Sequence, residues 1–188
     1  MSRTPDAQLR ERILDVAQGL LRSQGEKGLT LRAVADAAGT TTPTVYKRFP
    51  DKAAILVALA LRERERYVRR QAKRRTLEGA AAGYLDWAIQ HPHEYQLIYG
   101  PHWHQVFSKE TGRPGRQWAQ EKLAARHGGK PADYDLVATA LWMLLHGAAS
   151  LLCQQPTGPT AGQIREQCLA ACDRILEKAP HFGMSFPA

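Results

Sequence analysis

The fold is decided by LTLRAVADAAGTTTPTVYKRFPDKAAIL, the stretch from Leu29 to Leu56. Its apolar residues recur at helical spacing from Leu31 to Ala38, and Thr30 before them is a good N-cap. Gly39 stops this helix, and a threonine cap followed by a proline predicts a second helix from Pro43 to Phe49. Two short helices joined by a Gly-Thr-Thr turn indicate a helix-turn-helix.

Longer helices are expected on both sides of this stretch. Upstream, apolar residues at i, i+3, i+4 and i+7 spacing predict an amphipathic helix over residues 7–23, which Gly25 and Gly28 end. Downstream, Asp51 is expected to cap a long helix that runs from Lys52 to about Arg75.

The rest of the chain also has the periodicity of helices rather than strands. We expect helices at residues 80–90, 94–99, 116–126, 133–154 and 161–178, the last capped by Thr160. The predicted fold class is therefore all-α, with about nine helices.

Charge divides the chain unevenly. The 188 residues carry a net charge of +8. Residues 1–75 hold 17 basic and 8 acidic residues, a net of +9, whereas residues 76–188 hold 9 basic and 10 acidic residues. A basic module joined to a near-neutral one indicates that the first meets a polyanion, either nucleic acid or an anionic membrane surface.

Composition argues against several classes of protein. A content of 44% hydrophobic and 23% charged residues argues against disorder. The longest apolar run, 136–153, is interrupted by His146, Gly147 and Ser150, so we expect no membrane-spanning helix. The N-terminus lacks the apolar core of a signal peptide, and three cysteines do not make a disulfide scaffold, so we expect a cytoplasmic protein.

The helix-turn-helix predicts contact with DNA. A two-turn helix can enter the major groove, where small polar and basic side chains reach the base edges. The residues expected to be exposed there are Thr41, Thr42, Pro43, Thr44, Lys47 and Arg48. Tyr46 offers a hydroxyl to a phosphate, and Lys52 can hold a phosphate beside the N-terminus of the next helix.

These residues form a recognisable signature. It consists of the Leu29-Thr30-x-Arg32 opening, Ala35, Ala38-Gly39, Thr44-Val45-Tyr46, Phe49 and Lys52. With this signature, residues 8–58 resemble the DNA-binding region of TetR-family transcriptional regulators, although Thr40 stands where the family usually has an apolar residue. The resemblance implies groove-facing positions at Arg32, Thr42, Pro43, Thr44 and Arg48, phosphate contacts at Thr30, Thr41, Tyr46 and Lys52, and core positions at Leu31, Val34, Val45 and Phe49.

The stretch LRERERYVRRQAKRR, from Leu61 to Arg75, is rich in arginine. Glu63 and Glu65 allow ion pairs along one helix face. We interpret the stretch as a solvated connecting helix. The expected organisation is a DNA-binding domain at residues 1–52, a connecting helix at 53–75, and a helical effector-binding and dimerisation domain at 76–188.

The C-terminal part holds all four tryptophans. Its segment from Trp142 to Gly147, and His91-Pro92 followed by Tyr95, resemble one class of TetR-type C-terminal domains with a Trp-x-x-x-His-Gly motif. Trp142 and His146 share a helix face, where His146 bonds either a ligand or a backbone carbonyl. The candidate ligand-binding residues are Trp87, Tyr95, Tyr99, Trp103, Phe107, Trp118, Trp142, Met143 and His146; an aromatic core is the alternative.

Other chemistry has weaker support in the sequence. The histidine pairs His91/His93 and His102/His104 and the cysteines Cys153, Cys168 and Cys172 lack the usual zinc-ligand spacing, and Cys168 and Cys172 fit a buried helix interface. No Ser-His-Asp spacing, phosphate loop or metalloprotease motif is present. We therefore expect no catalytic residue, no metal and no cofactor.

The last two helices, 133–154 and 161–178, carry wide apolar faces, which predict a homodimer. The leading hypothesis is a one-component transcriptional repressor. It would bind a palindromic DNA operator as a homodimer and respond to a small apolar or aromatic effector, without contact to a membrane. The alternatives are a helical enzyme with a basic localising head and a DNA-binding protein without sequence preference. The sequence leaves open the effector, the operator, the regulated genes and the sign of regulation.

Overall fold

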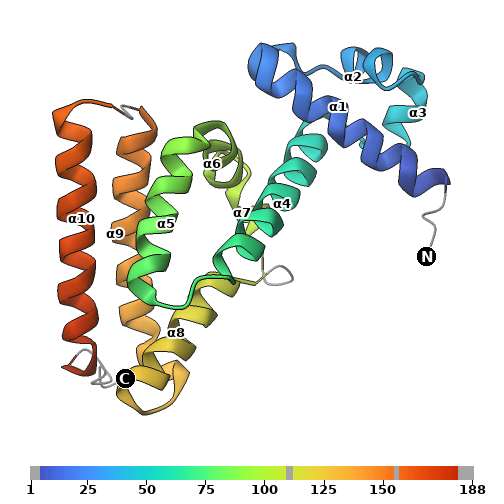
Figure 1. The fold of residues 1–188 in the computed structure, drawn as a ribbon. Coiled ribbons are helices and arrows are strands. Elements are labelled where there is room, and N and C mark those ends of the chain that lie inside the picture. The colour runs from blue at the N-terminus through green and yellow to red at the C-terminus, as the bar shows by residue number, and fades with distance from the viewer. Residues whose placement is uncertain (1–4, 109–111, 155–156, 182–188) are drawn as a thin grey trace. The chain divides into compact units, whose positions relative to one another are not determined.

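The computed structural model describes residues 5–108, 112–154 and 157–181, and in these ranges it contains helices and no strand (Figure 1). The α-helices are α1 (Pro5–Gly28), α2 (Leu31–Ala37), α3 (Thr42–Tyr46), α4 (Lys52–Gln71), α5 (Leu77–Gln90), α6 (Pro92–Tyr99), α7 (Trp103–Val106), α8 (Pro114–His127), α9 (Asp135–Gln154) and α10 (Pro159–Glu177). Two 3₁₀ helices are η1 (Pro131–Tyr134) and η2 (Ala179–His181). The all-α prediction is confirmed. The helix that the sequence did not predict is α7, which is too short to produce a periodic pattern.

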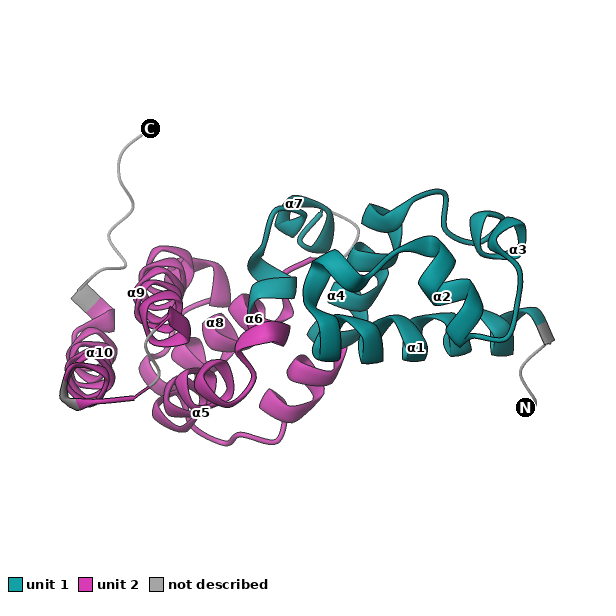
Figure 2. Ribbon diagram, turned by 90° about the horizontal axis from the view of Figure 1, so that it is seen from above, with its two compact units in different colours: residues 1–64, 96–108 teal, residues 65–95, 109–188 magenta. Residues whose placement is uncertain are grey.

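The chain divides into two compact units (Figure 2). Unit 1 contains Met1–Arg64 and Gln96–Ser108, and unit 2 contains Glu65–Tyr95 and Lys109–Ala188. The helix-turn-helix therefore shares a unit with α7 and the end of α6, a segment that we assigned to the C-terminal domain from the sequence.

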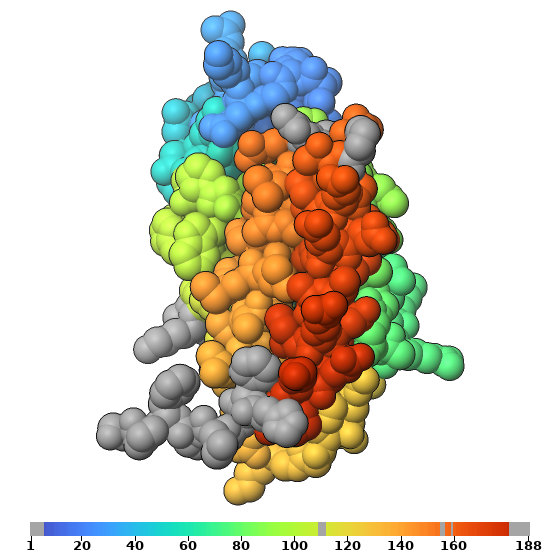
Figure 3. Space-filling model, turned by 90° about the vertical axis from the view of Figure 1, so that its left-hand side faces the viewer, coloured from blue at the N-terminus to red at the C-terminus, as the bar shows by residue number. Residues whose placement is uncertain are grey.

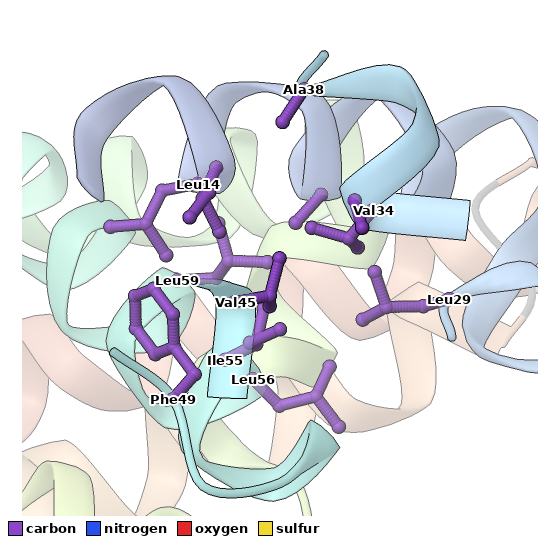
Figure 4. Packing of buried hydrophobic residues seen from close by; sticks show 12 residues of the cluster. Leu14, Leu29, Val34, Ala38, Val45, Phe49, Ile55, Leu56 and Leu59 are labelled. Carbon is purple, nitrogen blue, oxygen red and sulfur yellow. The ribbon is translucent and has the colours of Figure 1, made fainter. Parts of the chain in front are cut away.

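Unit 1 is built around one apolar core, to which α1, α2, α3 and α4 all contribute (Figure 4). Its fully buried side chains include Ile13 of α1, Val34 of α2, Val45 of α3 and Leu59 of α4. Leu97 of α6 packs against the same cluster. Because each helix places its apolar stripe in this core, the opposite faces of α2 and α3 are left for other contacts.

The helix-turn-helix is fixed by local hydrogen bonds. Thr30 caps α2, since its Oγ1 accepts the backbone N–H of Ala33 at 3.1 Å. Gly39 follows α2 with a φ of 60°, in the left-handed region that favours glycine, and the chain then turns into α3. Asp51 caps α4 as predicted, because its Oδ1 accepts the N–H of Ala54 at 2.7 Å.

Most helix starts lie one to three residues from the predicted positions, and α3 and α10 also show where the capping residue differs. The third helix begins at Thr42 rather than Pro43, because the side chain of Thr41 is the cap, and the regular helix ends at Tyr46 rather than Phe49. Beyond Tyr46 the chain continues in turns. The last helix begins at Pro159 with Gly158 as its N-cap, so Thr160 is not the cap. A proline is well suited to this first helical position.

Unit 2 is organised around α9, which packs against α5, α8 and α10. Figure 3 shows α9 in orange and α10 in red, lying side by side along one face of the molecule. Leu85 of α5, Leu152 of α9 and Cys172 of α10 are fully buried. Cys168 is also buried, so both cysteines of α10 lie in the predicted apolar environment.

The apolar character of α9 is stronger than we expected. Within Pro131–Gln154, the most apolar 18-residue window has a mean hydropathy of 1.8, so by length and composition alone this segment could cross a membrane despite its polar interruptions. One third of its most apolar window is buried inside the structure. Its packing against three other helices is that of a core helix.

Two alanine substitutions test the turn between α2 and α3. We expect Gly39→Ala to lower the free energy of unfolding by about 1–2 kcal/mol, because alanine is strained at positive φ. The control is Gly19→Ala on the exposed side of α1, which should instead raise stability by about 0.5–1 kcal/mol. Urea denaturation followed by circular dichroism measures both, and equal effects from the two variants would contradict the assigned turn.

Candidate DNA-binding surface and effector site

The predicted DNA-contact residues are distributed over one part of unit 1. Those that are exposed are Thr30, Arg32, Thr41, Pro43, Tyr46 and Lys47, and those that are half-buried are Thr42, Thr44, Arg48 and Lys52. Val34, Val45 and Phe49 are buried as core positions, whereas Leu31 is half-buried against the core. Tyr46 is 54% exposed, so its side chain is accessible to a partner.

The start of α3 has an ordered hydroxyl pair. The Oγ1 atoms of Thr41 and Thr44 lie 2.8 Å apart, and the backbone N–H of Thr44 points at Thr41 Oγ1 at 3.4 Å. Thr44 therefore has a fixed side-chain orientation before any partner arrives. A fixed hydroxyl with an adjacent methyl group suits contact with a base edge or with a thymine methyl.

Two predicted DNA-contact cations have acidic partners on α1. Arg48 forms an ion pair with Asp6, and its Nη1 donates to the backbone oxygen of Thr44 at 2.9 Å. Lys52 Nζ donates to the backbone oxygen of Glu26 at 2.6 Å and lies 3.3 Å from its carboxylate. The sequence did not reveal these pairs, because the partners are separated by many residues.

The connecting stretch is less solvated than we predicted. Glu65 forms the expected ion pair with Arg69, one helical turn away, at 3.3 Å. Glu63, however, is buried and accepts a hydrogen bond from Gln18 of α1 at 2.5 Å. Arg64 is also buried, with its guanidinium 5.0 Å from the centre of the Phe107 ring. Regular helix ends at Gln71 rather than near Arg75.

The predicted ligand-binding residues are divided between the two units. Tyr99 and Phe107 stack at 5.4 Å between ring centres within unit 1, which also contains the half-exposed Trp103. Trp118 on α8 lies in unit 2 and has Lys122 over its ring, at 5.8 Å.

Four of the other candidates come together in unit 2 on α5, α6 and α9, whereas Met143 of α9 is 62% exposed. Trp142 and His146 stack with 5.2 Å between ring centres and an interplanar angle of 11°, as their spacing predicted. Tyr95 stacks on His146 at 5.7 Å, and Trp87 lies 6.1 Å from Tyr95. Tyr84, which the sequence analysis did not single out, adds a ring 6.2 Å from that of Tyr95.

Hydrogen bonds at the Tyr95 hydroxyl fix this cluster. The Oη atom lies 2.7 Å from His146 Nδ1 and 3.0 Å from Ser150 Oγ, and it donates to the backbone oxygen of His146 at 3.1 Å. The imidazole therefore bonds a tyrosine hydroxyl, which was neither of the two options left open by the sequence. Ser150 was missed, although its position one turn after His146 was a usable signal.

Burial alters the titration of nearby groups. It lowers the pKa of His146, which favours the neutral imidazole, and raises the pKa of Cys153 to about 11. A neutral Cys153 thiol donates to the backbone oxygen of Ala88 at 3.3 Å. Within the described ranges, no three His, Cys, Asp or Glu side chains are grouped so that they could hold a metal ion.

The lowered pKa of His146 predicts a pH effect on stability. The unfolded chain has the ordinary histidine pKa near 6.5, so between the two pKa values it binds more protons than the folded chain. The contribution of His146 to stability is therefore complete above about pH 6.5 and is lost as the pH falls through the folded pKa. We expect His146→Gln to lack this loss in denaturation experiments at several pH values. A variant with the same acid sensitivity as the wild type would contradict the assignment.

The chain matches two family profiles. Residues 13–59 match "Bacterial regulatory proteins, tetR family", and residues 77–174 match "Tetracyclin repressor-like, C-terminal domain". A curated relative is the HTH-type transcriptional repressor KstR of Rhodococcus jostii (strain RHA1), which is 36% identical over 66 residues. That match covers 35% of this chain and 31% of KstR, so the chain spans about a third of the length of this relative.

Solved structures share the fold over nearly the whole chain. A TetR-family transcriptional regulator from Streptomyces coelicolor matches with a TM-score of 0.65 and 21% identity, covering 97% of this chain and 88% of its own. The transcriptional regulator SCO7222, a TetR from the same organism, matches with a TM-score of 0.66 and 22% identity. That match covers 94% of this chain and 99% of SCO7222. Because the C-terminal profile alone matches more than half of the chain, the protein belongs to the TetR family of bacterial transcriptional regulators.

Proposed function

We propose that the protein is a cytoplasmic, ligand-responsive repressor that binds a palindromic DNA operator as a homodimer. The observation that carries this proposal is the rigid helix-turn-helix, whose apolar side is buried in a core while Tyr46 and Lys47 stay exposed. The family is one of regulators and not of enzymes, which removes the enzyme alternative. The name of KstR, a repressor, supports the sign of regulation.

The roles within the DNA-binding domain, residues 1–52, follow from exposure and chemistry. Arg32, Thr42, Pro43, Thr44, Lys47 and Arg48 face the major groove, and Thr30, Thr41, Tyr46 and Lys52 contact phosphates. Residues 53–75 connect this domain to residues 76–188. In that C-terminal part, the effector binds and the two chains pair.

The exposed face of α9 supports a homodimer. Leu136, Met143 and Leu151 are 48%, 62% and 55% exposed, and their spacing of seven and eight residues places them on one helix face. Such a row of large apolar residues is stabilised when a partner covers it. A second copy of α9 and α10 would do so with two-fold symmetry, which matches the symmetry of a palindromic operator.

The effector is proposed to be a small apolar or aromatic molecule. Trp87, Tyr95, Trp142 and His146 offer stacked rings and one neutral imidazole, and Met143 lies beside Trp142 in the sequence. We further assign the C-terminal part to the class with the Trp-x-x-x-His-Gly motif, on its segment from Trp142 to Gly147. The other candidate effector contacts, Tyr99, Trp103, Phe107 and Trp118, are not part of this proposal and stay predictions from the sequence. An effector acts as an inducer only if it favours the conformation that does not bind DNA.

Three substitutions test the DNA-binding roles once footprinting has located an operator. Tyr46→Phe and Lys52→Ala should weaken binding to all sequences similarly, and Lys52→Ala should lower the salt slope by about one. Thr44→Ala should change base preference by about 1–3 kcal/mol at one position of the site. Lys178→Ala, which removes a charge from the other end of the chain, is the control. A footprint without a palindromic site would favour a DNA-binding protein that has no sequence preference.

One substitution tests the homodimer. Leu151→Lys places a charge on the exposed apolar face of α9, so we expect the chain to sediment as a monomer and to lose operator affinity. Ala125→Lys, on an exposed position of α8, adds the same charge elsewhere and should leave the dimer intact. Sedimentation velocity distinguishes the two, and a wild-type chain that is monomeric at operator-binding concentrations would contradict the proposal.

A further inference from the structure

Helix α1 places a carboxylate on Arg48. The side chain of Arg48 is only 18% exposed and pairs with Asp6, whose own side chain is 76% exposed. The Nε atom of Arg48 is buried and has no hydrogen-bond partner within the described ranges. A buried donor without an acceptor costs free energy. The pairing with Asp6 therefore leaves the Nε donor of Arg48 unsatisfied, and another acceptor could stabilise the guanidinium further. A DNA phosphate or a guanine edge could take the place of Asp6.

The C-terminal end of α1 also supplies a carboxylate, that of Glu26, to Lys52. Glu26 lies after the kink at Gly25 and holds the ammonium with both its backbone oxygen, at 2.6 Å, and its carboxylate, at 3.3 Å. The side chain of Glu26 is 62% exposed, so it is not buried by packing. Lys52 stands at the start of α4, the position at which a phosphate would receive both the ammonium and the helix N-terminus.

We propose that Asp6 and Glu26 are intramolecular counter-ions that occupy Arg48 and Lys52 in place of DNA, and thereby lower the affinity of the protein for DNA of any sequence. This inference rests on the proposed function. Each cation must leave its carboxylate before it can contact the nucleic acid, and each released carboxylate then stands near the phosphate backbone, where like charges repel. The two carboxylates thus oppose binding both before and after the exchange.

Lower affinity for DNA of any sequence would help a regulator to find its operator. Sequence-independent affinity comes almost entirely from cations that neutralise phosphates, and competing sites in a genome are very numerous. Occupying two cations with carboxylates weakens the electrostatic part of binding. Base contacts made by uncharged groups such as the Thr44 hydroxyl are unaffected, so this part of the preference for the operator is kept.

The same helix supplies a matched control. Asp15 pairs with Arg62 of α4 at 2.6 Å, and Arg62 also donates to Gln18, so this cation belongs to the contact between α1 and α4. Arg62 is not among the proposed DNA contacts. Asp15→Asn therefore also replaces a carboxylate by an amide on the same helix and raises the net charge by one. Unlike the test variants, it releases no proposed DNA-contact cation.

The experiment compares Asp6→Asn, Glu26→Gln and their double variant with Asp15→Asn. Fluorescence anisotropy measures binding to a labelled duplex of random sequence between about 50 and 200 mM salt. We expect Asp6→Asn and Glu26→Gln each to bind about two- to fivefold more tightly than Asp15→Asn at the low-salt end. The double variant should combine both gains, and the salt dependence should steepen. Melting curves confirm that all variants are folded.

Two results would overturn the inference. In one, Asp6→Asn and Glu26→Gln gain no more affinity than Asp15→Asn, which would show that only net charge matters. In the other, they lose affinity, which would show that the carboxylates orient the cations for DNA. Failure of the proposed function looks different, because the wild-type protein would then bind no sequence more tightly than the random duplex.

Discussion

The burial of Val45 is the constraint on which the DNA-binding surface depends. Helix α3 has five residues, and a helix of that length is not stable by itself in water. Its one fully buried side chain, Val45, lies in the core that α1, α2 and α4 also form, and Phe49 follows it into that core. The remaining residues of α3 therefore take their positions from the core and not from their own helical propensity. A partner meets a surface whose shape is set in advance, which lowers the entropy cost of binding.

Local signals predicted the elements of this unit well, because caps and stops act within four residues. Thr30, Gly39 and Asp51 have the roles that their chemistry predicted. The start of α3 was displaced by one residue, since three threonines precede Pro43 and sequence alone did not show which of them is the cap.

Long-range contacts were beyond sequence reasoning. Tyr95 and His146 are 51 residues apart, and nothing in the spacing of either showed that a hydroxyl would face an imidazole. Glu63 illustrates the same limit. The helical pattern placed this residue on a helix, but it could not show that Gln18 of α1 donates a hydrogen bond to its carboxylate. The division of α6 between the two units, after Tyr95, likewise depends on tertiary packing that the sequence did not show. Candidate DNA contacts were easier to name, because they lie within one continuous segment.

The apolar residues of helix α9 form two faces, one packed inside the chain and one exposed. Its hydropathy would suit a membrane, yet part of its surface packs on α5, α8 and α10 within the chain. Burial of that face explains only part of the apolar content, since large side chains on another face remain exposed. Trp142 is partly exposed and stacks on His146, whose imidazole is bonded to Tyr95, so the exposed face is continuous with the aromatic cluster. A ligand that shifted the Tyr95 ring would therefore act directly on a helix proposed to join the two chains. Under the proposed function, pairing of the chains and the response to an effector would both involve this one helix.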